Sequence, residues 1–124
     1  MRLIRLIIYL FFSIIFTSCD DEENILVQDA VKLLDQENVL FLDVRTSQEF
    51  RHEGSIKNAL LIPVNEIEKK ITMLEAYKSK SIIVYCRSGR RSKMAIKLLK
   101  EKDFNVNNLE GGFVAWRKYF SSKQ

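Results

Sequence analysis

Residues 84–92 read VYCRSGRRS and place one cysteine, Cys86, directly after a run of apolar residues. Three arginines follow within five residues, with Ser88 and Gly89 between the first and the second. A thiol reacts as its thiolate, and an unperturbed cysteine has a pKa of about 8.5. Fixed positive charge, the dipole of a following helix and inward-pointing N–H groups of a turn would each lower this pKa. The same groups would bind an anion, so the stretch predicts a nucleophilic cysteine in an anion-binding loop.

The net charge argues against a dedicated nucleic-acid binder, in which a basic stripe with interleaved aromatics is expected. The 124 residues include 20 basic and 16 acidic side chains, for a formal charge of +4. Arg2 and Arg5 lie in the first 18 residues, which contain no acid, so the remainder has 18 basic and 16 acidic residues, or +2. The length and the 47% hydrophobic content fit one globular domain.

The N-terminus has the pattern of an export signal. MRLIRLIIYLFFSIIFTSC contains two arginines, an apolar stretch over residues 6–16 and small residues before Cys19, which is the order of a secretory signal peptide. The apolar stretch is shorter than the roughly 20 residues of a spanning helix, and a short uncleaved anchor is the alternative. FTSC resembles the lipobox of bacterial lipoproteins, with Phe16 in place of the usual leucine. We predict a signal peptide (1–18), lipidation of Cys19, an acidic tether (19–24) and a place in the bacterial cell envelope, on its periplasmic or surface side.

Lipidation of Cys19 would leave Cys86 as the only free thiol. A lone cysteine after a strand can be an inert core residue, but the neighbouring arginines favour the reactive interpretation. No metal site is expected, because no second thiol would be free and His52 is the only histidine.

Apolar runs of strand length alternate with helical patterns along the rest of the chain. The predicted strands cover residues 25–27, 39–44, 81–86 and 105–109, with an extended segment at 59–64. The predicted helices cover residues 28–36, 46–54, 65–79, 90–104 and 111–120, with Thr46 or Ser47, Asn65, and Ser88 or Ser92 as caps. Because the strands at 39–44 and 81–86 are apolar at nearly every position, the pattern predicts an α/β fold with a mostly parallel sheet covered by helices on both faces. Ligands bind at the carboxyl ends of such strands, where Cys86 and Arg45 both lie.

The loop has the pattern Cys-x-x-Gly-x-Arg-Ser, and here the sequence resembles a single-domain rhodanese, a thiosulfate sulfurtransferase-like protein. Two further segments, FLDVRTSQEFRHEGSIKNALLIP and LEGGFVAW, resemble motifs of that family. Their matching residues are Asp43, Arg45, Glu49, Phe50, Gly54, Ile56, Ala59, Pro63, Gly111, Gly112 and Trp116. Ser55 stands where the family often has histidine. The resemblance implies a rhodanese-like domain over residues 25–120, with Asp43 and Arg45 as a pair that supports the active loop; a catalytic role for that pair is the alternative.

The family also implies a ping-pong transfer of sulfur without a metal or cofactor. Cys86 would take a sulfane sulfur from thiosulfate or a persulfide and pass it to a thiol or to cyanide. The substrate-binding residues would be Arg87, Ser88, Gly89, Arg90, Arg91 and Ser92. Arg91 could instead point inward and brace the loop.

Two other functions remain open from the sequence. Cysteine-dependent tyrosine-type phosphatases have arginine six positions after the cysteine, whereas here Ser92 is the sixth and Arg91 the fifth. The loop is therefore one residue shorter than a phosphate-binding loop, which argues against a phosphatase or an arsenate reductase. A non-catalytic module that binds a partner or senses sulfur would have no reason to keep the cysteine and its arginine-rich loop. The oligomeric state is not indicated.

Overall fold

A computed structural model describes residues 23–124 of the chain. The predicted signal peptide and Cys19 lie outside the described residues. Within residues 23–124, no helix has the length and apolar character needed to cross a membrane.

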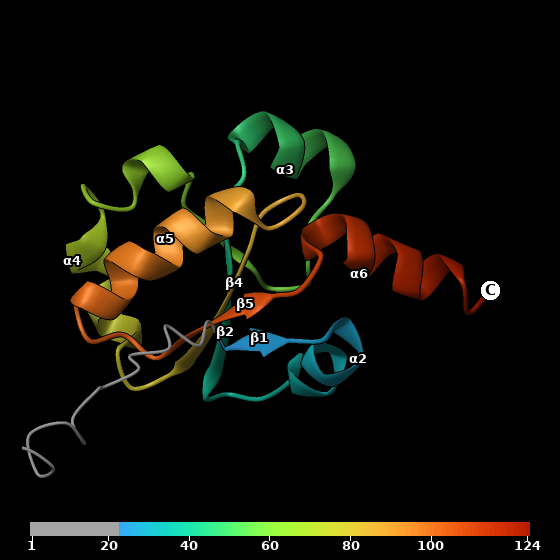
Figure 1. Cartoon of the computed structure of the whole chain (residues 1–124), viewed down its shortest axis with the longest axis horizontal. Helices are drawn as coiled ribbons and strands as arrows, with labels where there is room; N and C mark the ends of the chain where they lie inside the picture. Colours follow the sequence, from blue (N-terminus) through green and yellow to red (C-terminus); the bar gives the residue numbers. More distant parts are fainter. Residues whose placement is uncertain (1–22) are drawn as a thin grey trace, which may run out of the picture.

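Five short strands alternate with helices along the chain (Figure 1). In chain order, with η for 3-10 helices, the elements are β1 (Asn24–Ile25), α2 (Val27–Ala30), η1 (Val31–Leu33), β2 (Val39–Asp43), α3 (Ser47–Glu53), β3 (Leu60–Leu61), η2 (Val64–Glu66), α4 (Ile71–Leu74), η3 (Glu75–Tyr77), β4 (Ser81–Tyr85), α5 (Arg90–Glu101), β5 (Val106–Leu109) and α6 (Gly112–Ser121).

The strands form one sheet in the order β1-β5-β4-β2-β3, and every neighbouring pair is parallel. The central strands β2 and β4 are buried except at their first residues. This burial explains why their sequences are continuously apolar, since both faces of each strand are covered. The predicted α/β fold with a parallel sheet is confirmed.

The two faces of the sheet support separate hydrophobic layers, because successive strand residues point to opposite faces. Leu42 and Val84 face a layer that contains Ile67, Leu74 and Leu99 from the side of α4 and α5. On the opposite face, Phe41 and Ile83 pack in a layer with residues of α2 and α6, including Ala30 and Trp116. Helices therefore cover both faces, as predicted.

Several predicted boundaries differ from the structure; the predicted strand over residues 25–27, for example, is β1 (Asn24–Ile25) followed by α2 from Val27. The predicted helix over residues 65–79 is broken into η2, α4 and η3, and Lys70 (φ −105°, ψ 12°) lies outside the helical region between them. Burial of Ile67 and Leu74 in the core holds this segment without a continuous helix. The predicted tether also ends earlier, because Asn24 belongs to β1 and the Glu23 carbonyl accepts a hydrogen bond from Asn108 N–H.

Candidate active site

Cys86 directly follows β4 at the carboxyl end of the sheet and begins the turn into α5. Gly89 precedes the helix with a φ of +120°, a conformation that favours glycine. The helix has no side-chain cap, so the prediction of Ser88 or Ser92 as the cap is wrong. The turn folds over the thiol, and Cys86 is only 1% exposed.

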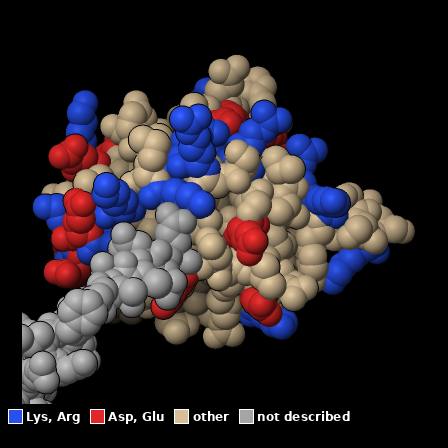
Figure 2. Space-filling view, viewed as in Figure 1, with Lys and Arg blue, Asp and Glu red and all other residues tan. Residues whose placement is uncertain are grey.

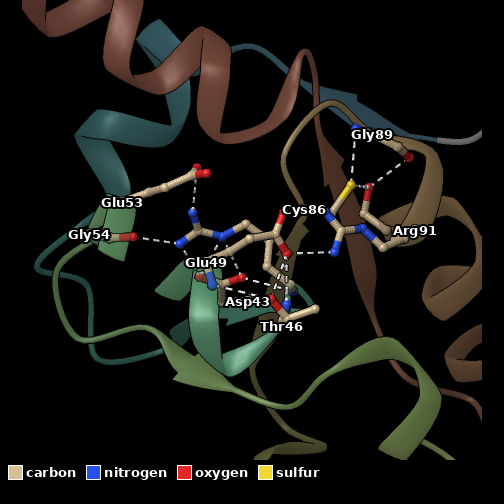
Figure 3. Close-up of polar contacts among 10 residues, drawn as sticks. Asp43, Thr46, Glu49, Glu53, Gly54, Cys86, Gly89 and Arg91 are labelled. Atoms are coloured by element: carbon tan, nitrogen blue, oxygen red, sulfur yellow. Dashed lines mark hydrogen bonds and ion pairs between the residues drawn. The ribbon is translucent and has the colours of Figure 1, made fainter. Parts of the chain in front are cut away.

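Hydrogen bonds converge on the Cys86 sulfur within this turn (Figure 3). The Gly89 N–H donates to Sγ over 3.0 Å, and the Ser92 Oγ lies 3.6 Å from Sγ. Burial raises the pKa of the Cys86 thiol, but hydrogen bonds from Ser92, Gly89 and Ser88 outweigh it, and the net pKa is lowered. Hydrogen bonds from the loop are therefore the cause of the lowered pKa, whereas the sequence analysis expected the arginines to contribute.

Asn108 of β5 completes the surroundings of Ser92, and the sequence analysis did not identify it. The Ser92 Oγ lies 2.6 Å from Asn108 Oδ1 and 2.8 Å from the Gly89 carbonyl oxygen. Asn108 Nδ2 in turn donates to Asn24 Oδ1 over 2.9 Å. Ser92 and Asn108 are both buried. The only signal in the sequence is an amide side chain inside a predicted buried strand.

The first turn of α6 is hydrogen-bonded to the cysteine turn. Phe113 N–H donates to the Cys86 carbonyl over 2.9 Å, and Val114 N–H donates to the Arg87 carbonyl over 3.1 Å. A Cβ on Gly112 would lie 2.6 Å from both carbonyl oxygens, and Gly112 has a φ of +60°. Only glycine fits this close approach, which explains Gly112 as the first residue of α6.

Arg91 points toward α3 and forms an ion pair with Glu49 (Figure 3). The Arg91 Nη1 and Nη2 atoms donate to the two Glu49 carboxylate oxygens over 2.6 and 2.7 Å. Glu49 also completes a capping box with Thr46, as the sequence pattern predicted. The Arg91 hydrogen bonds, aided by those from Thr46, lower the Glu49 pKa to about 2. Of the two roles considered for Arg91, bracing the loop is the one that this geometry provides.

Asp43 and Arg45 form a buried pair behind the loop. Arg45 Nε and Nη2 donate to the Asp43 carboxylate over distances of 2.7–3.1 Å, and Nη2 also donates to the Gly54 carbonyl over 2.6 Å. The guanidinium carbon lies 4.1 Å from the centre of the Phe113 ring. Because the Phe113 N–H donates to the Cys86 carbonyl, Phe113 links the pair to the cysteine turn.

The remaining loop side chains point outward. Arg87, Ser88 and Arg90 are exposed. Neither Arg87 nor Arg90 forms an ion pair with a carboxylate in residues 23–124. His52 is exposed on α3. Within residues 23–124, the structure thus separates two arginines without an ion pair from a third that pairs with Glu49.

Comparisons with known proteins identify the family of this domain. Residues 26–119 match the model of the rhodanese-like domain. A sulfurtransferase from Allochromatium vinosum is 39% identical over 89 residues, covering 71% of this chain and 80% of that protein. A tRNA uridine(34) hydroxylase from Escherichia coli is 30% identical over 109 residues, which are 84% of this chain but 31% of the hydroxylase.

Solved structures show the same fold. A rhodanese-related protein from Thermoplasma volcanium superposes with a TM-score of 0.71 at 31% identity, covering 78% of this chain and 92% of that one. The matched domain spans most of the described residues, including the cysteine loop and the two further segments that resemble the family. The chain therefore belongs to the rhodanese-like domain family.

Proposed function

We propose that this protein is a sulfurtransferase that transfers a sulfane sulfur through a persulfide on Cys86. The observation that carries the proposal is the hydrogen bonding of the thiol within the short loop, with Gly89 N–H 3.0 Å from Sγ and a lowered Cys86 pKa. A thiolate held in this way is a ready nucleophile without a separate general base. The similarity to a sulfurtransferase supports the same class of reaction.

The reaction proceeds in two half-reactions. The Cys86 thiolate attacks the outer sulfur of thiosulfate, the sulfur–sulfur bond of the donor breaks, and sulfite leaves with its electron pair. Cys86 then carries the persulfide. Its outer sulfur can accept hydrogen bonds from the backbone N–H groups of residues 87–92, as an oxyanion accepts them in an oxyanion hole. Cyanide or a thiolate attacks that outer sulfur and releases Cys86 as a thiolate. A persulfide donor reacts in the same way, with a thiolate as its leaving group.

The loop arginines divide between two tasks in this proposal. Arg87 and Arg90 are exposed and without ion pairs in the described part of the chain, so they attract the dianionic donor. Arg91 holds the loop against α3 through Glu49. Asp43 and Arg45 support the loop from behind through Phe113.

Turnover of thiosulfate and cyanide tests the proposal. The purified full-length chain should produce thiocyanate, and Cys86→Ser should produce none. The same samples are given a phenyl phosphate, which a phosphatase would hydrolyse. Phosphate release without thiocyanate would replace the proposal with the phosphatase alternative, and absence of both activities would favour a binding module.

We also propose that Cys19 is lipidated and anchors the protein in the bacterial cell envelope. This proposal rests on the residues FTSC after an apolar stretch, in the order of a lipoprotein signal. Cells that express the chain with labelled palmitate should label the wild type and not Cys19→Ser. A membrane-bound wild type without label would instead indicate the uncleaved anchor.

A further inference from the structure

A groove of about 350 Å³ runs along α6 beside the cysteine loop. Its walls come from the loop, from α3 and from one face of α6, and they include Arg87, Glu53, Phe113, Val114, Arg117 and Lys118. Basic side chains over the region of α6 are visible in Figure 2. The proposed reaction with thiosulfate assigns no role to Arg117 or Lys118.

The charges in the groove favour an anion. Arg87, Arg117 and Lys118 are exposed, and none of them forms an ion pair within residues 23–124. The one carboxylate, Glu53, lies 3.7 Å from Arg45 Nη1, a buried atom that has no hydrogen-bond partner in the described structure. Among the described residues, the groove therefore has three cations without an ion pair and one carboxylate that already lies beside Arg45. A ligand with two or more carboxylates would complement this surface.

The groove adjoins the backbone of the turn that carries Cys86. Arg87, in its wall, is the residue after Cys86. Phe113 and Val114, also in the wall, donate their N–H groups to the carbonyls of Cys86 and Arg87 over 2.9 and 3.1 Å. A ligand in the groove therefore lies at a fixed place relative to the loop.

The length and floor of the groove suit more than a small inorganic anion. Its α6 wall extends from Phe113 to Ser121, and eight residues of helix rise about 12 Å. Val114 is 52% exposed and offers apolar surface between the charged groups. A thiol of about two or three amino-acid units, with carboxylates distant from the sulfur, would match this surface.

We propose that the groove along α6 is the acceptor subsite and selects thiols that carry carboxylates. This inference rests on the proposed sulfurtransferase function. The acceptor thiolate attacks the outer sulfur of the Cys86 persulfide, a new sulfur–sulfur bond forms on the acceptor, and the bond to Cys86 breaks. Cys86 leaves as a thiolate, and the acceptor carries away the persulfide. Arg117 and Lys118 determine specificity by binding the acceptor carboxylates.

The test separates loading of Cys86 from its discharge. The full-length chain is first treated with thiosulfate, freed of donor and checked by intact mass for the added sulfur. The loaded protein is then discharged with glutathione, which has two carboxylates, with neutral 2-mercaptoethanol or with cationic cysteamine. Rates are compared at equal thiolate concentration. The variant Arg117→Glu/Lys118→Glu is compared with Lys69→Glu/Lys97→Glu, which makes the same charge change at exposed residues outside the groove.

We expect the groove variant to lose about tenfold in discharge by glutathione, equivalent to ~1.4 kcal/mol, with 2-mercaptoethanol unchanged. The control variant should keep the rates of the wild type. Equal effects of both variants, or equal effects on all three thiols, would overturn the proposal.

Failure of the wild type to load would refute the sulfurtransferase function and is visible before any acceptor is added. The groove is then tested separately with S-methylglutathione, which cannot react. Amide NMR shifts on α6 that disappear in Arg117→Glu/Lys118→Glu would support an anion subsite, and their absence in the wild type would overturn it.

Discussion

The ion pair between Glu49 and Arg91 should make a measurable contribution to stability, and its pH dependence is distinctive. Glu49→Gln keeps the shape of the side chain and removes its charge. Hydrogen bonds from Arg91, aided by those from Thr46, lower the Glu49 pKa from 4.5 to about 2 against the opposing effect of burial. Each tenfold change in an acid constant corresponds to about 1.4 kcal/mol, so the whole shift corresponds to about 3 kcal/mol. The side chains are 31% and 20% exposed, and solvent screening reduces the expected loss at neutral pH to about 2 kcal/mol.

The sign follows from linkage between folding and proton binding. Because the folded pKa lies below the unfolded value, the stabilisation is fully present above pH 4.5 and decreases as the pH falls toward 2. The difference in unfolding free energy between wild type and Glu49→Gln should therefore be largest at pH 7 and nearly absent near pH 2. Because both proteins have the same other acidic groups, the difference between their unfolding free energies reports the titration of Glu49 alone.

Urea unfolding followed by circular dichroism measures this difference across the pH range. Glu75→Gln is the matched control, because Glu75 forms an exposed pair with Lys78 over 3.5 Å, and exposed pairs contribute about 0–1 kcal/mol. A loss in Glu49→Gln no larger than in Glu75→Gln would refute the reasoning. So would a loss that is as large near pH 2 as at pH 7.

Three further predictions concern the support of the loop. Gly112→Ala places a Cβ 2.6 Å from the Cys86 and Arg87 carbonyl oxygens, so we expect a loss of about 2 kcal/mol or more in urea unfolding; an unchanged unfolding free energy would contradict the steric argument. Tyr85→Phe removes the hydroxyl that accepts a hydrogen bond from the Ile56 N–H over 3.1 Å. The buried N–H is then unpaired, which should reduce the unfolding free energy by about 1–3 kcal/mol. An unchanged unfolding free energy would show that water replaces the hydroxyl. Ser92→Ala removes a hydrogen bond that lowers the Cys86 pKa, so the pH at which iodoacetamide reacts half-maximally should rise; an unchanged midpoint would mean that the backbone N–H groups are sufficient.

The sequence predicts the sheet and the place of the thiol because both depend on local patterns. Residues 39–44 and 81–86 are apolar at nearly every position, and burial on both faces requires this pattern. Thr46 and Glu49 have the spacing of a capping box, which is present. The broken helix after Pro63 could not be predicted, because packing of Ile67 and Leu74 against distant strands decides it.

The partners within the site come from distant segments, and the sequence does not show them. Arg91 and Glu49 are 42 residues apart, and no spacing rule connects α3 with α5. Asn108 lies 16 residues after Ser92, on β5, whereas Ser92 lies in α5. The sequence analysis therefore considered Arg91 for both the substrate and the loop, and only the three-dimensional arrangement assigns it to Glu49.

Intact mass after a single exposure to thiosulfate tests the central claim most directly. The full-length wild-type chain should gain one sulfur atom, peptide mapping should locate it on Cys86, and cyanide should remove it. Cys86→Ser should gain nothing, and Cys19→Ser should still load. A wild-type chain that gains no sulfur from thiosulfate or from a small persulfide would contradict the account.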